Sequence, residues 1–181
     1  MASRVASARR YAEAVFELAS DTGSFDVWAN DLRTIAAFAS EPEVAGLLAS
    51  GRVPREEKLR LLSAGLEKQV GPLAWNLVRL LEQRGKTDLA REVQRVYQER
   101  YDDHRGVAHA VVTTAVPLAD DERAAVAQRL TALTGKQVDV TPVVDEAIIG
   151  GIVARIGDEL IDASTRSRLV ALKRRLEGAV R

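Results

Sequence analysis

The stretch HRGVAHAVVTTAV, residues 104–116, divides the sequence into two parts. Before it, apolar residues recur at three-to-four spacing, which is the period of an amphipathic helix. Within it, Gly106 precedes a short segment rich in β-branched residues, and such a segment is typical of a strand. We therefore expect an α+β protein, with a helical domain at residues 1–104 and a small α/β domain at residues 105–181.

Upstream of this stretch, the pattern predicts six amphipathic helices with short connections, an arrangement that forms a compact bundle. Gly23 and Gly85 follow two of these helices as C-terminal stops. Asp26 and Thr87 are the expected caps of two others. The predicted helices are 4–20, 26–39, 42–49, one that opens at Pro54, 72–84 and one that opens at Thr87.

Downstream, the pattern predicts strand, helix, three further strands and a last helix, which together make a small mixed sheet with helices. The first of these helices is expected to begin at a cap, Asp120, to face Val126, Leu130 and Leu133 inward, and to end at Gly135. The strands are expected at 107–116, 136–144, 147–156 and around Leu160-Ile161, with a tight hairpin at Gly157-Asp158. Ser164 is expected to cap a final helix whose apolar positions are Leu169, Leu172, Leu176 and Val180.

The composition narrows the classes of function. Hydrophobic residues make up 46% of the chain, whereas aromatic residues make up 4%. Lysine plus arginine and aspartate plus glutamate number 26 each, and a chain that wraps nucleic acid usually shows a basic excess. The absence of cysteine removes disulfides, thiolate nucleophiles and cysteine metal sites. We therefore expect no nucleic-acid partner and weakly favour a reducing compartment.

The sequence also argues against a membrane span and a removable leader. The longest apolar run, residues 147–154, is far shorter than the roughly 20 residues that a spanning helix needs. The N-terminal MASRVASARR resembles a transit peptide in its arginine, serine and alanine content. A helical pattern already begins at Val5, however, which leaves no room for a removable segment. We therefore expect a soluble protein.

No catalytic, cofactor or metal site is predicted. His104 lies beside Asp102 and Asp103, but ligands so close together on one helix end cannot complete a tetrahedral shell. The glycines at 150, 151 and 157 lack the Gly-Lys-Ser/Thr that a phosphate loop needs. We expect Gly150 and Gly151 to lie inside a strand, where glycine marks a bulge or a close backbone approach. The basic run 173–175 is read as a solvated helix face.

Two helices, 4–20 and 72–84, carry more apolar surface than one stripe requires. Two interpretations remain open on physical grounds. Either both helices are central and buried on all sides, or each keeps one apolar face for a partner helix.

Three segments resemble one protein family. The run ARRYAEAVF, residues 8–16, resembles the opening helix of the delta subunit of bacterial F-type ATP synthases, a relative of the mitochondrial oligomycin-sensitivity-conferring protein. The run NLVRLL, residues 76–81, followed by Gly85-Lys86, is similar to the family's fifth helix. The family's C-terminal signature is similar to VDEAIIGG at 144–151, then RIGD at 155–158, Ile161-Asp162, Ser164 and Arg168-Leu169. Ala154 departs from this signature, where a larger aliphatic residue is expected.

The resemblance covers the whole chain and implies a non-catalytic stator subunit without a cofactor. It implies that the helical domain grips the N-terminal helix of an alpha subunit of the α3β3 catalytic head, in a groove between helices 4–20 and 72–84. The groove residues carried over are Tyr11, Ala12, Ala14, Val15, Asn76, Arg79, Leu80 and Gln83. The α/β domain is implied to bind the C-terminal end of the b-type peripheral stalk.

The resemblance also places the chain at the cytoplasmic face of the bacterial plasma membrane, as a peripheral part of a complex that couples proton flow to ATP synthesis. The C-terminal signature residues carried over are Asp145, Gly150, Gly151, Arg155, Gly157, Asp162 and Arg168, which are implied to shape the stalk-binding domain. Arg155 and Asp162 are expected to pair across the hairpin. The rival hypotheses are a small nucleic-acid-binding module and an unrecognised hydrolase.

Overall fold

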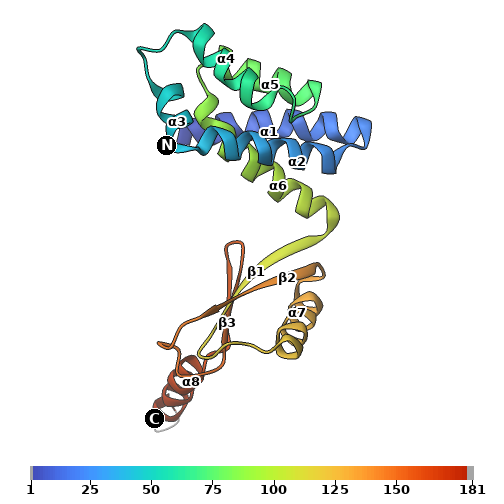
Figure 1. Ribbon diagram of the computed structural model, residues 1–181. Helices are drawn as coiled ribbons and strands as arrows, with labels where there is room; N and C mark the ends of the chain where they lie inside the picture. The colour runs from blue at the N-terminus through green and yellow to red at the C-terminus, as the bar shows by residue number, and fades with distance from the viewer. Residues whose placement is uncertain (1, 179–181) are drawn as a thin grey trace. The chain divides into compact units, whose positions relative to one another are not determined.

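The computed structural model describes residues 2–178, and they form a mixed α+β structure (Figure 1). The chain separates into two compact units, one up to Tyr101 and one from Asp102 onward. The helices of the first part are α1 (Ala2–Thr22), α2 (Phe25–Ser40), α3 (Pro42–Ala49), α4 (Arg55–Leu66), α5 (Pro72–Gln83), the short 3-10 helix η1 (Thr87–Leu89) and α6 (Ala90–Arg105). The later elements are β1 (Val107–Thr114), α7 (Asp120–Thr134), β2 (Gln137–Val144), β3 (Ile152–Ile156), β4 (Glu159–Asp162) and α8 (Thr165–Gly178).

The helices of the first unit are held by one apolar cluster. Alanines on α1 let neighbouring helices pack closely, because Ala8, Ala12 and Ala19 are fully buried. Larger side chains fill the space between helices, with Leu32 from α2 and Leu62 from α4 almost completely buried. Tyr97 of α6 is also fully buried, and its hydroxyl donates a hydrogen bond to the Phe25 carbonyl at 3.0 Å. Burial raises the pKa of the Tyr97 phenol, which therefore keeps the proton that it donates.

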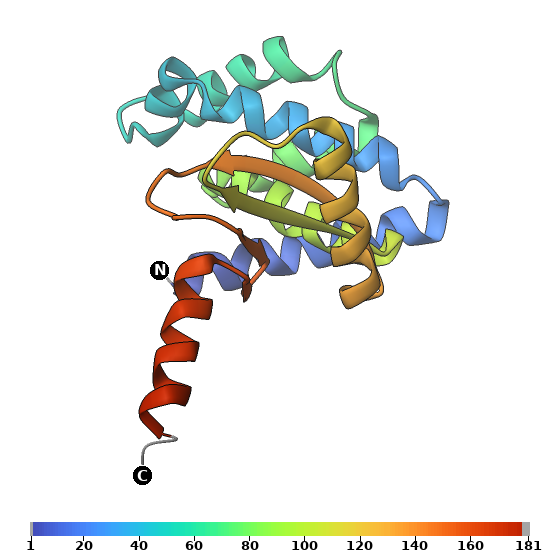
Figure 2. The same ribbon diagram turned by 90° about the horizontal axis from the view of Figure 1, so that it is seen from below.

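The second unit is a four-stranded mixed sheet in the order β2-β1-β3-β4, and the predicted mixed sheet is confirmed. β1 and β2 are parallel and are joined by α7, whereas β1–β3 and β3–β4 are antiparallel. α7 lies against one face of β1 and β2 (Figure 2). The core under α7 consists of Ala110, Val112, Leu130, Val138, Val140 and Ala154.

Glycines end the helices where the sequence predicts. Gly23, Gly85 and Gly135 all take positive φ values, between 60° and 70°, which glycine adopts without steric cost. Gly157 has φ +56° in the β3–β4 hairpin, as predicted.

Several predicted caps lie elsewhere. α2 begins one residue before Asp26, whose carboxylate accepts a hydrogen bond from the Tyr101 hydroxyl at 2.7 Å. Thr87 begins the 3-10 turn that precedes α6. α7 is preceded by Ala119, whose N–H donates to the Glu122 carboxylate at 3.0 Å, so Asp120 is already helical. Residue type indicates which side chains are able to cap a helix, whereas the position of the cap depends on where the backbone turns.

The strand predicted at 147–156 is wrong in its first half. β3 begins at Ile152, so Gly150 and Gly151 lie in the loop before it. Leu133, predicted to face inward, is 66% exposed, whereas Leu130, one turn earlier on α7, is buried.

Candidate partner-binding surfaces

The apolar surface of α1 divides between the core and the exterior. Ala12 and Val15 belong to the buried stripe, at 0% and 3% exposure, so they cannot line an open groove. Ala14 and Leu18 are exposed, and Tyr11 is half-buried against the core. Of the four α1 residues carried over from the resemblance, Tyr11 and Ala14 therefore remain available to a partner.

α5 presents a clearer stripe. Leu73, Asn76, Leu80 and Gln83 lie three to four residues apart and are all exposed, so they share one helix face. Leu73 and Leu80 are 53% and 38% exposed, although both are large aliphatic residues. Ala74, Leu77, Val78 and Leu81 supply the buried face. α5 thus keeps one apolar face outside the core.

The end of α5 lies next to the beginning of α1. The Lys86 ammonium donates to the Ser7 hydroxyl at 3.3 Å. Arg79 and Gln83 lie toward the other neighbour of α5, where they line a cavity of about 530 Å³ together with Arg55 and Leu59 from α4. The structure therefore brings Ser7 of α1 beside the exit of α5, whereas Arg79 and Gln83 border α4.

Part of the C-terminal signature lies around the start of α8. Asp162 accepts a hydrogen bond from the Ser164 N–H at 2.9 Å and another from the Ser167 hydroxyl. These hydrogen bonds hold the pKa of the Asp162 carboxyl below its usual value, and the one from the Ser167 hydroxyl has the largest effect. The Ser164 hydroxyl accepts from the Ser167 N–H at 3.2 Å and caps α8, as predicted.

Asp162 does not form the predicted pair with Arg155. In the β3–β4 ladder Asp162 is opposite Val153, whereas Arg155 is opposite Leu160. The carboxylate of Asp162 instead holds the capping residue Ser164 through its N–H and contacts the first turn of α8 through the Ser167 hydroxyl.

Gly150 and Gly151, in the loop before β3, contact the residues at the start of α8. The Gly150 carbonyl accepts from the Thr165 N–H at 2.9 Å. Gly151 has φ +81°, and a Cβ there would lie 2.6 Å from the Ala163 carbonyl oxygen. This position therefore requires glycine for both conformation and space.

The rest of the signature is divided between two loops and a cavity. Asp145 accepts from the Ala147 N–H at 2.9 Å in the loop after β2, and Gly157 forms the hairpin. Gly151 and Arg168 line a cavity of about 460 Å³ between α7 and the sheet. Ala154, the departure from the family pattern, also lines it and is fully buried.

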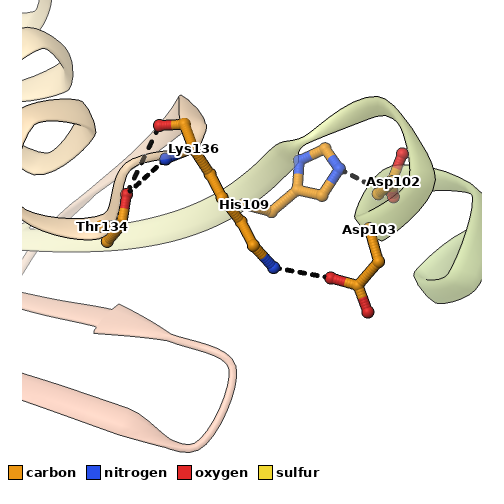
Figure 3. A network of polar contacts seen from close by, with 5 residues as sticks. All are labelled: Asp102, Asp103, His109, Thr134 and Lys136. Carbon is orange, nitrogen blue, oxygen red and sulfur yellow. Dashed lines mark hydrogen bonds and ion pairs between the residues drawn. The ribbon is translucent and has the colours of Figure 1, made fainter.

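A polar network joins the last turn of α6 to the sheet within the second unit (Figure 3). His109 Nε2 lies 3.1 Å from Asp102 Oδ2, and Lys136 Nζ lies 2.8 Å from Asp103 Oδ1. In the described part of the chain, no group of three or more histidine, aspartate or glutamate side chains could hold a metal ion. The Lys136–Asp103 pair is exposed, and an exposed ion pair contributes only about 0–1 kcal/mol to stability.

The sequence does not identify several surface residues on α1 and α5 or in the cavity beside α7. Leu18 and Leu73 are exposed members of apolar helices, and Arg129 and Leu133 line the cavity beside α7. Periodicity marks such positions as apolar but does not separate a core face from a surplus one. Among residues 2–178, no helix combines the length and the apolar character needed to cross a bilayer.

Comparison with known proteins points to one family. The family model described as ATP synthase delta (OSCP) subunit matches residues 7–176. An ATP synthase subunit delta from Dehalococcoides mccartyi is 36% identical over 174 residues, which cover 96% of each chain. One from Thioalkalivibrio sulfidiphilus is 35% identical over 162 residues, covering 90% of this chain and 91% of the relative.

A solved structure shares the fold. A chain of the Toxoplasma gondii mitochondrial ATP synthase hexamer superposes with a TM-score of 0.69 at 20% identity. The match covers 93% of this chain and 96% of that chain.

Proposed function

Because the chain belongs to the ATP synthase delta (OSCP) subunit family, a stator component of F-type ATP synthases, we propose that it joins the catalytic head to the peripheral stalk without catalysing a reaction itself. The observation that carries this proposal is a family match over nearly the whole chain, which spans both units. A subunit that resists the torque of rotation needs two attachment surfaces, one for the head and one for the stalk.

The first unit is the proposed attachment to the head. We infer that α1 to α6 act as one bundle, which the shared apolar cluster supports. The proposed ligand is an N-terminal helix of an alpha subunit, which would pack on Ala14 of α1 and on Asn76 and Leu80 of α5. Exposed aliphatic residues on a rigid helix face suit helix-in-groove recognition, and an alanine allows a close approach.

The proposed contact surface is smaller than the sequence resemblance implies. Ala12 and Val15 are omitted because both are buried, and Arg79 and Gln83 are omitted because they line the cavity that borders α4. Leu18 and Leu73 are added because both are exposed apolar residues on the same two helices. The proposed contacts are Tyr11, Ala14, Leu18, Leu73, Asn76 and Leu80.

The second unit is the proposed attachment to a b-type stalk subunit. Support comes from α8, whose Leu169 and Val170 are exposed, and from the apolar cavity beside α7. With both attachments made, the subunit would lie at the cytoplasmic face of the bacterial plasma membrane as a peripheral part of the complex.

The head attachment is tested with two exposed substitutions, Ala14→Glu and Leu80→Glu, in the full chain. We expect either change to weaken binding to the isolated α3β3 head by at least about tenfold, which corresponds to 1.4 kcal/mol. Leu47→Glu on α3 is the matched control, since Leu47 is 44% exposed and lies outside the proposed surface. Unchanged binding by Ala14→Glu and Leu80→Glu, with unchanged thermal melting, contradicts the proposed surface.

A further inference from the structure

The core face of the four-stranded sheet is wider than the helix that covers it. Neighbouring strands lie about 4.8 Å apart, so the outer two of four strands are about 14 Å apart. A helix with its side chains is about 10–12 Å across. α7 joins the parallel strands β1 and β2 and lies over them (Figure 2). The same face of β3 and β4 is therefore only partly covered by α7.

A cavity of about 460 Å³ occupies this partly covered region, between α7 and strands β3 and β4. We call it the α7 cavity. Its floor includes Ala154 of β3 and Ile161 of β4, which are opposite each other in the ladder. Because Ala154 carries only a methyl group, it leaves space that a larger aliphatic residue would fill. The volume lies within the range of roughly 300–1,000 Å³ that is usual for small-molecule sites.

The lining of the α7 cavity combines apolar groups with charge of one sign. Of the eleven described residues that line it, nine are aliphatic residues or glycine, and the other two are Arg129 and Arg168. The cavity between α4 and α5 differs, because Glu56 and Glu82 line it together with arginines. The α7 cavity thus presents positive charge without a carboxylate among the described residues of its lining.

Arg129 and Arg168 come from different helices, α7 and α8, and both are exposed. Neither forms an ion pair in the part of the chain that the structure describes. A guanidinium group keeps its charge at physiological pH and offers a planar fork of donors to a carboxylate or phosphate. A complementary ligand therefore combines an apolar body for the walls with an anionic head for the arginines.

We propose that the α7 cavity binds a small amphipathic anion, with an aliphatic chain over Ala154 and Ile161 and a carboxylate or phosphate head on Arg129 and Arg168. A medium-chain fatty acid has this chemistry. Burial of the chain favours binding because it removes apolar surface from water, and the two arginines fix the orientation of the head. The inference goes beyond the proposed attachments to head and stalk. Its test contains neither partner, so its failure leaves both attachments standing.

The experiment is an NMR titration of the full chain with octanoate. Amide signals of β3 and β4 should shift saturably, with a dissociation constant of about 1 mM or lower, while signals of the helical unit stay unchanged. Octyl phosphate in a second titration identifies the preferred head group. Octanol, which has the chain without the charge, should bind at least about fivefold more weakly. Acetate, which has the head without the chain, should show no saturation in the same concentration range.

Two neighbouring alanines on α7 provide a matched pair of variants. Ala124 and Ala125 are both exposed, but only Ala125 lines the cavity. Ala125→Glu should weaken octanoate binding by at least about tenfold, because a carboxylate in the wall repels the anionic head. Ala124→Glu changes the net charge by the same amount and should weaken binding by less than about threefold, because solvent and salt screen a charge outside the cavity.

The arginines and the floor are tested in the same way. Arg129→Gln/Arg168→Gln should weaken octanoate binding by about tenfold. The control is Arg123→Gln/Arg166→Gln, since Arg123 and Arg166 are exposed on the same two helices but do not line the cavity. Ala154→Leu, which fills the floor, should abolish the saturable shifts. Circular dichroism melts establish that each variant is folded, and the surface variants decide the matter if Ala154→Leu does not fold.

Three results would overturn the proposal. The first is the absence of saturable shifts at β3 and β4 with both octanoate and octyl phosphate. The second is equal affinity for octanol and octanoate, which would mean that the arginines do not hold the head. The third is equal loss of binding in Ala124→Glu and Ala125→Glu, which would mean that net charge alone controls the association.

Discussion

The two units differ in how their buried apolar side chains are enclosed. In the helical unit, buried residues come from every helix from α1 to α6 and enclose one another. In the second unit, the buried cluster lies on the single sheet face that α7 covers. The exposed Leu160 marks the other face. The helical unit thus has the larger enclosed core, although both units leave large apolar side chains exposed.

This difference suggests two kinds of attachment. A partner on the helical unit would bind a surface that lies over a closed apolar core. A partner on the second unit would cover apolar area that the unit does not bury, and whatever binds only the folded state stabilises it. Both tryptophans, Trp28 and Trp75, lie in the helical unit, so tryptophan fluorescence reports on that unit alone.

The largest expected effect is that of a charge in the helical core. Ala12→Glu should lower the free energy of unfolding of the helical unit by about 4 kcal/mol or more, because Ala12 is fully buried in the apolar cluster of that unit. Ala14→Glu, two residues away and exposed, should change it by less than about 0.5 kcal/mol. Urea titrations followed by tryptophan fluorescence compare the two variants. Equal stability of both would mean that α1 does not pack as described.

A smaller effect is expected for a substitution at Gly151, in the loop before β3 of the second unit. Gly151→Ala should destabilise that unit by about 2–3 kcal/mol, because the added Cβ meets the Ala163 carbonyl at a positive φ. The control is Gly157→Ala, where φ is also positive but the space is open, and it should cost about 1–2 kcal/mol. Amide signals of β1 and β3 in NMR follow the second unit, and tryptophan fluorescence should not change in either variant. A larger loss in Gly157→Ala would contradict the close approach at Gly151.

A smaller effect still is expected for a polar contact between helices. Tyr101→Phe removes the hydrogen bond to Asp26 and should cost the helical unit about 1 kcal/mol. The cost stays low because Asp26 is exposed and water can replace the hydroxyl. Denaturant midpoints from tryptophan fluorescence measure the loss. The same loss in Asp26→Ala and in the double variant would identify the hydrogen bond as its source, and additive losses would exclude it.

The sequence predicts the elements better than it predicts their faces. The change of pattern at residues 104–116, the glycine stops and the hairpin at Gly157 all depend on local backbone preference, and the structure agrees with each. Leu133 and Leu80 have the same residue type and spacing as core leucines, yet both are exposed. Only the packing of neighbouring elements decides which apolar face becomes the core, and a single sequence does not contain that packing.

In the C-terminal signature, the sequence likewise does not predict which contacts individual residues make. The residue pattern predicts a strand through Gly150-Gly151, and the family resemblance implies an ion pair between Arg155 and Asp162. The structure instead uses Gly151 for a close backbone approach and Asp162 for the first turn of α8. Glycine and aspartate are each compatible with several local roles, so their identity alone did not select the observed one.

The smallest effect expected is a dependence of α8 on pH through Asp162. Its pKa is lowered in the folded state by hydrogen bonds from Ser167 and Ser164, so the carboxylate favours folding above the unfolded value of about 3.9. This contribution should disappear as pH falls from about 5 through 3.9 and then through the lower folded value. Carbon chemical shifts of the first turn of α8, measured by NMR, should therefore move toward coil values in acid. Asp162→Asn should show a partly frayed turn already at pH 6 and little further change, because an amide does not ionise. If both proteins lose the turn over the same pH range, another carboxylate controls the start of α8, and the second unit's exposed helix is anchored by something other than its signature aspartate.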